Sequence, residues 1–219
     1  KHSQDSKFYL RNIKFEIKKN EKIGIIGPSG SGKSTLIDIL TGVLKPEKGE
    51  VIVDKKSIFS NLRGWQNLIG YVPQKIFILD ESLRNNILFG LDGKKYDDVK
   101  ILSLIKKLSL EKLLNRLPNG LDGNLGEEGV NFSGGEIQRI GICRALIYEP
   151  QILFLDEATS SLDISTEQQI LNELKLFQDK TIISIAHRIN TLKNCSKIYC
   201  IDNGKVVDQG NFDKFKKQN

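Results

Sequence analysis

One glycine-rich loop constrains the fold of this chain more than any other part of the sequence. It reads Gly27-Pro28-Ser29-Gly30-Ser31-Gly32-Lys33-Ser34-Thr35. This is the pattern G-x-x-x-x-G-K-[ST], which joins a buried strand to a helix. The apolar run 22–26 before the loop predicts the strand, and the apolar positions within residues 34–40 have helical spacing. Gly42 is expected to end that helix, so the sequence predicts a strand–loop–helix unit of an α/β fold.

The same loop predicts a binding site for the phosphates of a nucleoside triphosphate. Backbone N–H groups converge at the N-terminus of the helix, where negative charge is stabilised. Glycine is needed because a Cβ atom would keep the backbone from closing around the phosphates. Lys33 would reach the β- and γ-phosphates, and the Ser34 hydroxyl would bind Mg²⁺. The alternative, a flexible Gly/Ser loop, is disfavoured by the strand and the helix on either side.

Two acidic residues follow a second buried strand. Asp156 and Glu157 come directly after the apolar run 152–155, which is typical of a central parallel strand. Since ligands bind beyond the carboxyl ends of parallel strands, both carboxylates should face the phosphate loop. One would hold Mg²⁺ and the other would orient the water that attacks the γ-phosphate. The alternative is that these acidic residues only favour the first turn of the next helix.

A second glycine-containing segment opens a helix that is predicted to run to about residue 148. It reads Ser133-Gly134-Gly135-Glu136. The pattern S-x-x-E is a capping box, which explains Ser133 and Glu136 without any ligand. It does not explain two consecutive glycines, which weaken the first turn of a helix. They suggest a second helix N-terminus that is open to the close approach of a phosphate.

Taken together, these motifs resemble the ATP-binding cassette family, and the resemblance covers essentially the whole chain. It identifies residues 27–35 as the Walker A loop, 152–156 as the Walker B strand and Glu157 as the catalytic glutamate. The segment 132–136 is similar to the family signature, usually Leu-Ser-Gly-Gly-Gln, with Phe and Glu at its first and last positions. The capping box would hold the added negative charge of the glutamate away from a phosphate.

Three further residues match positions of the family. Gln74 resembles the Q-loop glutamine, and His187 resembles the switch histidine. Asp163 ends the segment Ser160-Ser161-Leu162-Asp163, which is similar to the D-loop. Each residue also has a simpler explanation: a surface glutamine, a hydrogen-bonding loop histidine and a helix N-cap, respectively.

The resemblance also implies the cofactors, the reaction and an assembly. ATP would be hydrolysed to ADP and phosphate, with Ser34, Gln74 and Asp156 at Mg²⁺. Glu157, His187 and Gln74 would be the catalytic residues. In the family two cassettes meet head to tail, so a homodimer is expected in which each ATP lies between one Walker A loop and the other copy's signature. The expected nucleotide contacts are residues 27–35, Gln74, Asp156, Asp163 and signature residues 133–136, of which Ser133 and Gly135 would act in trans.

The fold class that follows is α/β: a P-loop NTPase core of RecA-like type with a mainly parallel sheet, an antiparallel β subdomain and an inserted α-helical subdomain. Residues 1–76 and 148–219 would form the ATP-binding core with the β subdomain, and residues 77–147 the helical, signature-bearing subdomain. Strands are expected at 8–17, 50–54, 69–72, 181–186 and in a hairpin across Asn203-Gly204, and helices at 99–108, 110–117 and 164–177.

Two segments are similar to exporter cassettes in particular. Residues 72–90 read like the exporter segment after the Q-loop, and Leu125-Gly126-Glu127-Glu128-Gly129 resembles the loop that touches a membrane domain. A transmembrane domain is therefore expected upstream of residue 1, coupled through the regions of Gln74 and 126–129, at the cytoplasmic face of a membrane. The substrate stays open among lipid, lipid-linked glycan, peptide and drug. The alternatives are a soluble cassette ATPase acting on nucleic acid or ribosomes, and a free-standing importer ATPase subunit.

Composition adds three expectations. The net charge is +6, but the lysines are scattered without interleaved aromatic residues, so no nucleic-acid partner is expected. Three cysteines without metal-ligand spacing fit a reducing cytosol. The chain has no methionine, which suggests a piece of a longer polypeptide. The aromatic residue that stacks on adenine in the family would then lie upstream, with His2 as the alternative.

Overall fold

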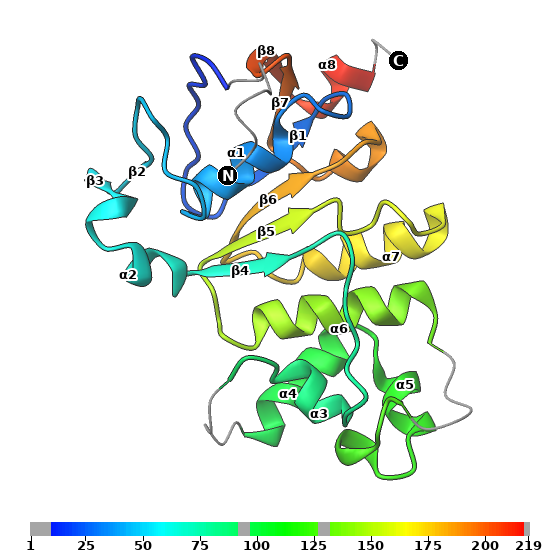
Figure 1. The fold of residues 1–219 in the computed structure, drawn as a ribbon. Coiled ribbons are helices and arrows are strands. Elements are labelled where there is room, and N and C mark those ends of the chain that lie inside the picture. The colour runs from blue at the N-terminus through cyan, green and yellow to red at the C-terminus, as the bar shows by residue number, and fades with distance from the viewer. Residues whose placement is uncertain (1–9, 92–96, 127–131, 217–219) are drawn as a thin grey trace.

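A six-stranded sheet forms the centre of the structure. The computed structural model describes residues 10–91, 97–126 and 132–216. In order across the sheet, the strands are β4 (Ile69–Val72), β5 (Ile152–Asp156), β6 (Thr181–Ile185), β1 (Lys22–Ile26), β7 (Lys197–Asp202) and β8 (Lys205–Gly210). Neighbours from β4 to β7 run parallel, whereas the edge strand β8 runs antiparallel to β7 (Figure 1). The carboxyl ends of β4, β5 and β6 therefore lie side by side.

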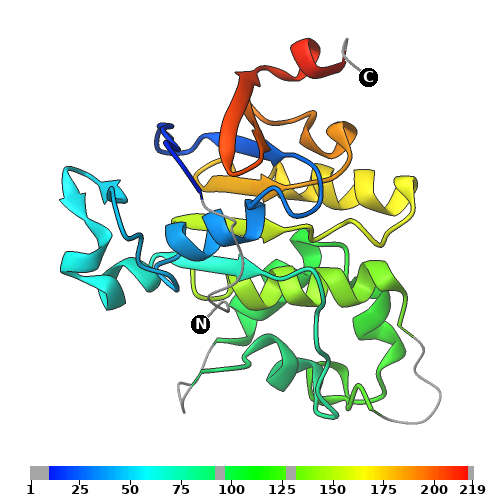
Figure 2. The same cartoon turned by 45° about the horizontal axis from the view of Figure 1, so that its top comes forward.

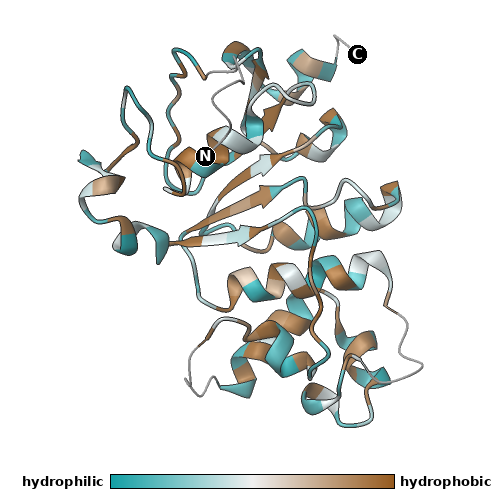
Figure 3. Ribbon diagram, viewed as in Figure 1, coloured by the Kyte–Doolittle hydropathy of each residue, from teal (hydrophilic) through white to brown (hydrophobic). Residues whose placement is uncertain are grey.

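Helices cover both faces of this sheet. They are α1 (Lys33–Leu40) on one face and α6 (Gly134–Leu146) and α7 (Ile164–Leu174) on the other (Figure 2). Strand β5 contributes apolar side chains to both faces of the sheet, because successive side chains of a strand point in opposite directions. Phe154 belongs to the apolar cluster that includes α1, whereas Leu153 and Leu155 belong to the cluster that includes α6 and α7. In Figure 3, β5 and β6 are accordingly mostly hydrophobic.

A group of helices lies below the sheet in Figure 1. It consists of α3 (Leu83–Ile87), α4 (Asp98–Lys107), α5 (Glu111–Arg116), the 3₁₀ helix η2 (Gly120–Asp122) and α6. Ile101, Leu104 and Ile105 of α4 are buried, as their helical spacing predicts. These helices lie between β4 and β5 in the sequence, and the division of the chain into a helical subdomain at residues 77–147 and an ATP-binding core stays a prediction.

A small antiparallel pair lies beside the sheet. It is formed by β2 (Ile52–Val53) and β3 (Lys56–Ser57) and is followed by η1 (Ile58–Ser60) and α2 (Leu62–Gln66). The prediction of a strand at 50–54 was too long, because Asp54 and Lys55 have φ angles of 48° and 66° and form the turn. The hairpin across Asn203-Gly204 is confirmed by the β7–β8 pairing. The last elements are η3 (Ile189–Leu192) and α8 (Phe212–Lys216).

The prediction of a strand at 8–17 is wrong for the part of it that the structure describes. Residues 10–17 contain no strand, although Ile13, Phe15 and Ile17 pack against the apolar cluster of the sheet. The side chains alternate between half-buried and exposed, but the N–H of Arg11 reaches the oxygen of Gly204 without a continuous ladder following. The alternation of apolar residues therefore predicted which side chains pack against the sheet, but it did not predict the hydrogen bonding of the backbone.

Two further features concern the cysteines and the length of the helices. Cys143, Cys195 and Cys200 are all free, and burial raises the pKa of the Cys143 and Cys195 thiols. Within the described ranges, every helix is too short or too polar to cross a bilayer.

Candidate functional site

The phosphate loop connects the end of β1 to α1, as predicted. A Cβ atom at Gly27 would lie 2.0 Å from the backbone oxygen of Ile201 on β7, so only glycine fits there. Gly30 and Gly32 have φ angles of 75° and 103°, in the left-handed region that favours glycine. The shape of the loop therefore requires glycine at three positions before any ligand is considered.

Lys33 begins α1 and turns back over the loop. Its Nζ atom donates to the backbone oxygens of Gly27 and Pro28, both at 2.9 Å. Burial lowers the pKa of Lys33, and the two carboxylates at the end of β5 oppose that shift. The hydroxyl oxygen of Ser31 is buried and has no hydrogen-bond partner within the described ranges. In the part of the chain that the structure describes, this buried cation donates hydrogen bonds only to its own loop, which also carries the Ser31 hydroxyl without a partner. This arrangement fits a site for phosphate oxygens.

Asp156 is the last residue of β5 and is held by the neighbouring strand. The hydroxyl of Tyr71 on β4 donates to Oδ2 of Asp156 at 2.9 Å. Burial raises the pKa of Asp156 above its usual range, and the hydrogen bond from Tyr71 opposes that rise. The carboxylate is thus oriented while remaining partly accessible, which suits a ligand of Mg²⁺.

Glu157 lies between Gln74 and His187. The Nε2 atom of His187 is 2.6 Å from Oε1 of Glu157, and the side-chain amide of Gln74 donates to Oε2 at 2.9 Å. These residues follow β5, β4 and β6, so the strand order itself brings the three predicted catalytic residues together. Glu157 also has a φ of 52°, a conformation that is uncommon outside glycine and that concentrates at functional sites.

The signature segment forms the N-terminus of α6. The Ser133 hydroxyl accepts a hydrogen bond from the N–H of Glu136 at 3.2 Å, and Oε2 of Glu136 accepts one from the N–H of Ser133 at 2.9 Å. This is the capping box that the sequence predicts. A Cβ atom at Gly135 would lie 2.5 Å from the Thr166 side chain of α7, so this glycine is required for helix packing as well.

The charge of Glu136 is paired within the chain. Nη2 of Arg116, from α5, donates to Oε1 of Glu136 at 2.7 Å. Burial raises the pKa of Glu136, but the hydrogen bonds from Ser133 and Arg116 outweigh burial and leave the pKa lowered. Glu136 is therefore ionised at neutral pH, and its charge is compensated on the side that faces α5.

Asp163 caps α7 and does not join the catalytic cluster. Its Oδ1 accepts from the N–H of Thr166 at 3.0 Å and from the Ser165 hydroxyl at 2.6 Å, and these hydrogen bonds lower the pKa of Asp163. The simpler explanation of this residue thus holds within one chain. In the described ranges, no hydrogen bond or ion pair connects residues 133–136 or Asp163 to the phosphate loop.

Comparison with known proteins agrees with this geometry. A family model described as ABC transporter matches residues 10–160. The chain belongs to the ABC transporter family. The resemblance inferred from the motifs is therefore confirmed, and so is the P-loop fold class that it implied.

Relatives of this ABC transporter chain are named as export proteins. It is 40% identical over 203 residues to a Rickettsia typhi protein named for an export ATP-binding/permease function, covering 92% of the chain and 35% of that protein. It is 37% identical over 208 residues to the multidrug resistance ABC transporter ATP-binding and permease protein of Lactococcus lactis, covering 94% and 35%. A solved structure, of a bacterial Atm1-family ABC exporter with ATP bound, matches with a TM-score of 0.87 at 32% identity, covering 100% of the chain and 38% of that protein. The chain thus spans little more than a third of each of them.

Two contacts of this ABC transporter chain were not expected from its sequence. They are the Tyr71 hydrogen bond to Asp156 and the Arg116 ion pair with Glu136. Tyr71 meets Asp156 only because β4 and β5 pair in one particular register. Arg116 meets Glu136 only because α5 packs near the start of α6. Neither contact carries a local sequence signal.

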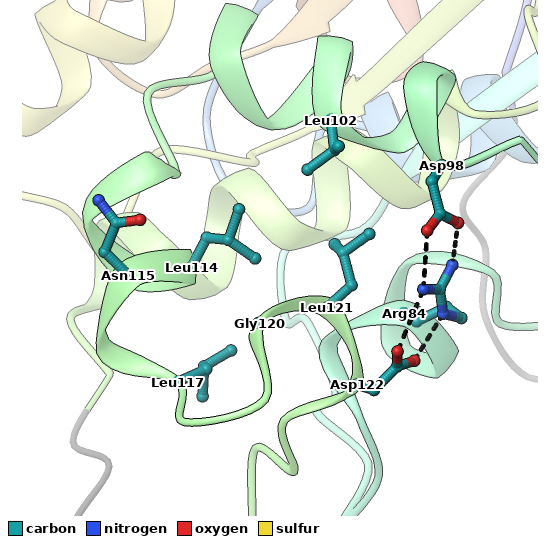
Figure 4. A pocket seen from close by; sticks show the side chains of 9 residues that line it. All are labelled: Arg84, Asp98, Leu102, Leu114, Asn115, Leu117, Gly120, Leu121 and Asp122. Carbon is teal, nitrogen blue, oxygen red and sulfur yellow. Dashed lines mark hydrogen bonds and ion pairs between the residues drawn. The ribbon is translucent and has the colours of Figure 1, made fainter.

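A separate concavity lies among the helices of the ABC transporter chain (Figure 4). Its volume is about 480 Å³, and the leucines that line it include Leu102, Leu114 and Leu121. At one side, Arg84 binds the carboxylates of both Asp98 and Asp122, which raises the pKa of the arginine. This guanidinium is already paired with two carboxylates, and none of the predicted nucleotide contacts lines the concavity.

Proposed function

We propose that this chain is the ATP-hydrolysing domain of an exporter-type ABC transporter. The observation that carries the proposal is the convergence of Gln74 and His187 on Glu157, at the same edge of the sheet as the loop of Lys33. The relatives named for ATP-binding and permease functions in one protein support the exporter type. Hydrolysis of ATP to ADP and phosphate is the reaction that this arrangement serves best.

Glu157 would act on the attacking water. The water oxygen forms a bond to the γ-phosphorus, the water proton passes to a carboxylate oxygen of Glu157, and the bond to the β–γ bridging oxygen breaks. ADP leaves with that electron pair. Gln74 and His187 hold the carboxylate from two sides, and His187 would also approach the γ-phosphate when nucleotide is bound.

The phosphate loop would bind the triphosphate through its N–H groups and through Lys33. Within the described ranges no cluster of three His, Cys, Asp or Glu side chains could hold a metal ion. Mg²⁺ is expected to bind the phosphate oxygens of ATP together with protein ligands. Ser34, Gln74 and Asp156 are the proposed protein ligands. When bound, Mg²⁺ would neutralise charge that develops on the phosphate oxygens.

A second copy of the domain would complete the site. Ser133 and Gly134 are exposed at the N-terminus of a 13-residue helix, where a phosphate would be stabilised. We propose that Ser133 and Gly135 approach the ATP bound by the other copy, with Asp163 at the same interface. Closure of such a pair would exclude water and supply hydrogen-bond donors that one chain lacks.

The remainder of the protein would include a membrane domain. Two segments that we expect to contact it lie together: the N–H of Leu125 donates to the oxygen of Glu81 at 2.9 Å, and a Cβ atom at Gly126 would touch Asp80. Asp80 and Glu81 belong to the segment that follows Gln74. Leu125 and Gly126 lie at the start of the glycine-rich segment, whose residues 127–129 are outside the described ranges. We propose that they form one coupling surface at the cytoplasmic face of a membrane, for a substrate that is a lipid, a lipid-linked glycan, a peptide or a drug.

ATP turnover by the intact protein tests this proposal. We expect Mg²⁺-dependent hydrolysis that changes when the protein is moved from detergent into lipid vesicles, because a membrane domain would transmit its state to the site. Hydrolysis that responds instead to added nucleic acid or ribosomes would favour the soluble alternative. The absence of any Mg²⁺-dependent hydrolysis would contradict the assigned function.

A further inference from the structure

A buried carboxylate that the proposed mechanism does not use lies behind the catalytic cluster. Glu167 is in the first turn of α7, and its side chain is 3% exposed. Its Oε1 atom accepts hydrogen bonds from the hydroxyls of Thr159 and Thr191, both at 2.8 Å. Its Oε2 atom lies 3.8 Å from Nη1 of Arg188. A carboxylate is costly to bury unless such contacts compensate it, so these contacts are what makes its position tolerable.

The two threonines belong to the loops that carry the catalytic residues. Thr159 follows Glu157 in the loop after β5, and Thr191 follows His187 in the segment after β6. A cavity of about 220 Å³ lies between these loops and is lined by Glu157, His187 and Glu167. Because this space is not filled by side chains, close packing does not fix the separation of the loops there. Glu167 joins the two loops through its hydrogen bonds with Thr159 and Thr191.

We propose that Glu167 is a positioning residue of the hydrolytic site. One oxygen of its carboxylate holds both loops, so that Glu157 and His187 keep their separation of 2.6 Å. The φ of 52° at Glu157 needs such an external restraint, because a relaxed loop would leave that conformation. Helix α7 begins after Asp163 and carries Glu167 in its first turn. A movement at the start of α7 would therefore displace the Glu167 carboxylate and, through Thr159, the loop that carries Glu157. The inference deepens the proposed function and rests on it.

Turnover and nucleotide affinity, measured separately in the intact protein, test this role. Glu167→Ala should lower kcat about tenfold or more, because small displacements of catalytic groups have effects of that size. The Kd for ATP should change less than about threefold, since Glu167 does not touch the phosphate loop. Glu167→Gln keeps an oxygen acceptor for both hydroxyls and should recover most of the rate. Backbone amide exchange should speed up in both loops, 157–160 and 186–191, in the alanine variant.

Glu173→Ala is the matched control. Glu173 lies on the same helix and is 11% exposed, and its carboxylate binds Arg139 at 2.8 Å without touching either loop. We expect this variant to lower the Tm without a comparable loss of kcat. The inference would be overturned if Glu167→Ala had a normal kcat, or if its ATP affinity fell by the same factor as its kcat. It would also be overturned if Glu167→Gln lost as much kcat as Glu167→Ala.

A parallel Glu157→Gln variant separates this inference from the proposed function. If Glu157→Gln hydrolyses ATP normally, the assignment of the catalytic glutamate has failed. If Glu157→Gln is inactive while Glu167→Ala is fully active, only the positioning role has failed.

Discussion

We predict that loss of the ion pair between Arg116 and Glu136 lowers the rate of ATP hydrolysis. Their N–O distance is 2.7 Å, and the side chains are 49% and 18% exposed. Exposed ion pairs contribute about 0.2–1 kcal/mol, and hydrogen bonds to charged groups about 1.5–3 kcal/mol. Because one partner is well exposed, we take about 1 kcal/mol, which corresponds to about a fivefold change in an equilibrium constant or a rate.

Arg116→Ala should therefore lower kcat/KM for ATP with Mg²⁺ about fivefold, because in the proposed dimer the charge of Glu136 is then left uncompensated near the γ-phosphate bound by the other copy. Glu136→Gln removes that charge and keeps an oxygen for the N–H of Ser133, so its kcat/KM should stay within about twofold of the unsubstituted protein. In the double variant, the loss caused by Arg116→Ala should disappear.

Steady-state ATPase assays of the four proteins in this cycle measure the coupling directly. Lys100→Ala breaks the ion pair between Lys100 of α4 and Glu149, which follows α6, and serves as the control, with no change in kcat/KM expected. The reasoning is refuted if Arg116→Ala behaves like the unsubstituted protein. It is also refuted if the double variant is as slow as Arg116→Ala, since the arginine would then act by another route.

Two further predictions concern stability. Gly27→Ala should lower the free energy of unfolding by about 1–3 kcal/mol or more, because its Cβ would meet the Ile201 backbone oxygen at 2.0 Å, and Ser29→Ala in the same loop should change it little in thermal melts. Burial raises the pKa of Asp156 in the folded state above its value in the unfolded chain. The ionised carboxylate therefore destabilises the nucleotide-free fold at neutral pH, and this destabilisation fades as the pH falls through the folded-state pKa. Asp156→Asn should therefore be more stable than the unsubstituted protein in chemical denaturation at neutral pH, with the difference shrinking in acid; a difference that grows in acid would contradict this.

Much of the phosphate site could be predicted because its signals are local. The strand at 22–26, the loop and the helix after it are adjacent in sequence, and their order leaves few alternatives. The carboxylates after the β5 strand could be placed for the same reason, since a continuous apolar run predicts a central parallel strand. The helical insertion was visible in the apolar periodicity of α4, where Ile101, Leu104 and Ile105 are buried, whereas Leu102, which belongs to the same apolar pattern, is exposed.

Other features depend on pairing between distant segments and carry no local signal. Residues 10–17 alternate like a strand, yet the described backbone makes no ladder, because hydrogen bonding needs a partner that alternation does not specify. The meeting of Gln74, Glu157 and His187 depends on the spatial order of β4, β5 and β6, and was expected only through the family resemblance. The Glu167 contacts with two threonines likewise require the fold to be known.

The central claim is that Glu157 activates the attacking water, and phosphate release by Glu157→Gln tests it most directly. The isosteric glutamine cannot accept the water proton, while the phosphate loop is unchanged. We expect the variant to bind ATP with nearly normal affinity and to retain it uncleaved over many turnover times of the unsubstituted protein. Near-normal steady-state phosphate release by Glu157→Gln would contradict it.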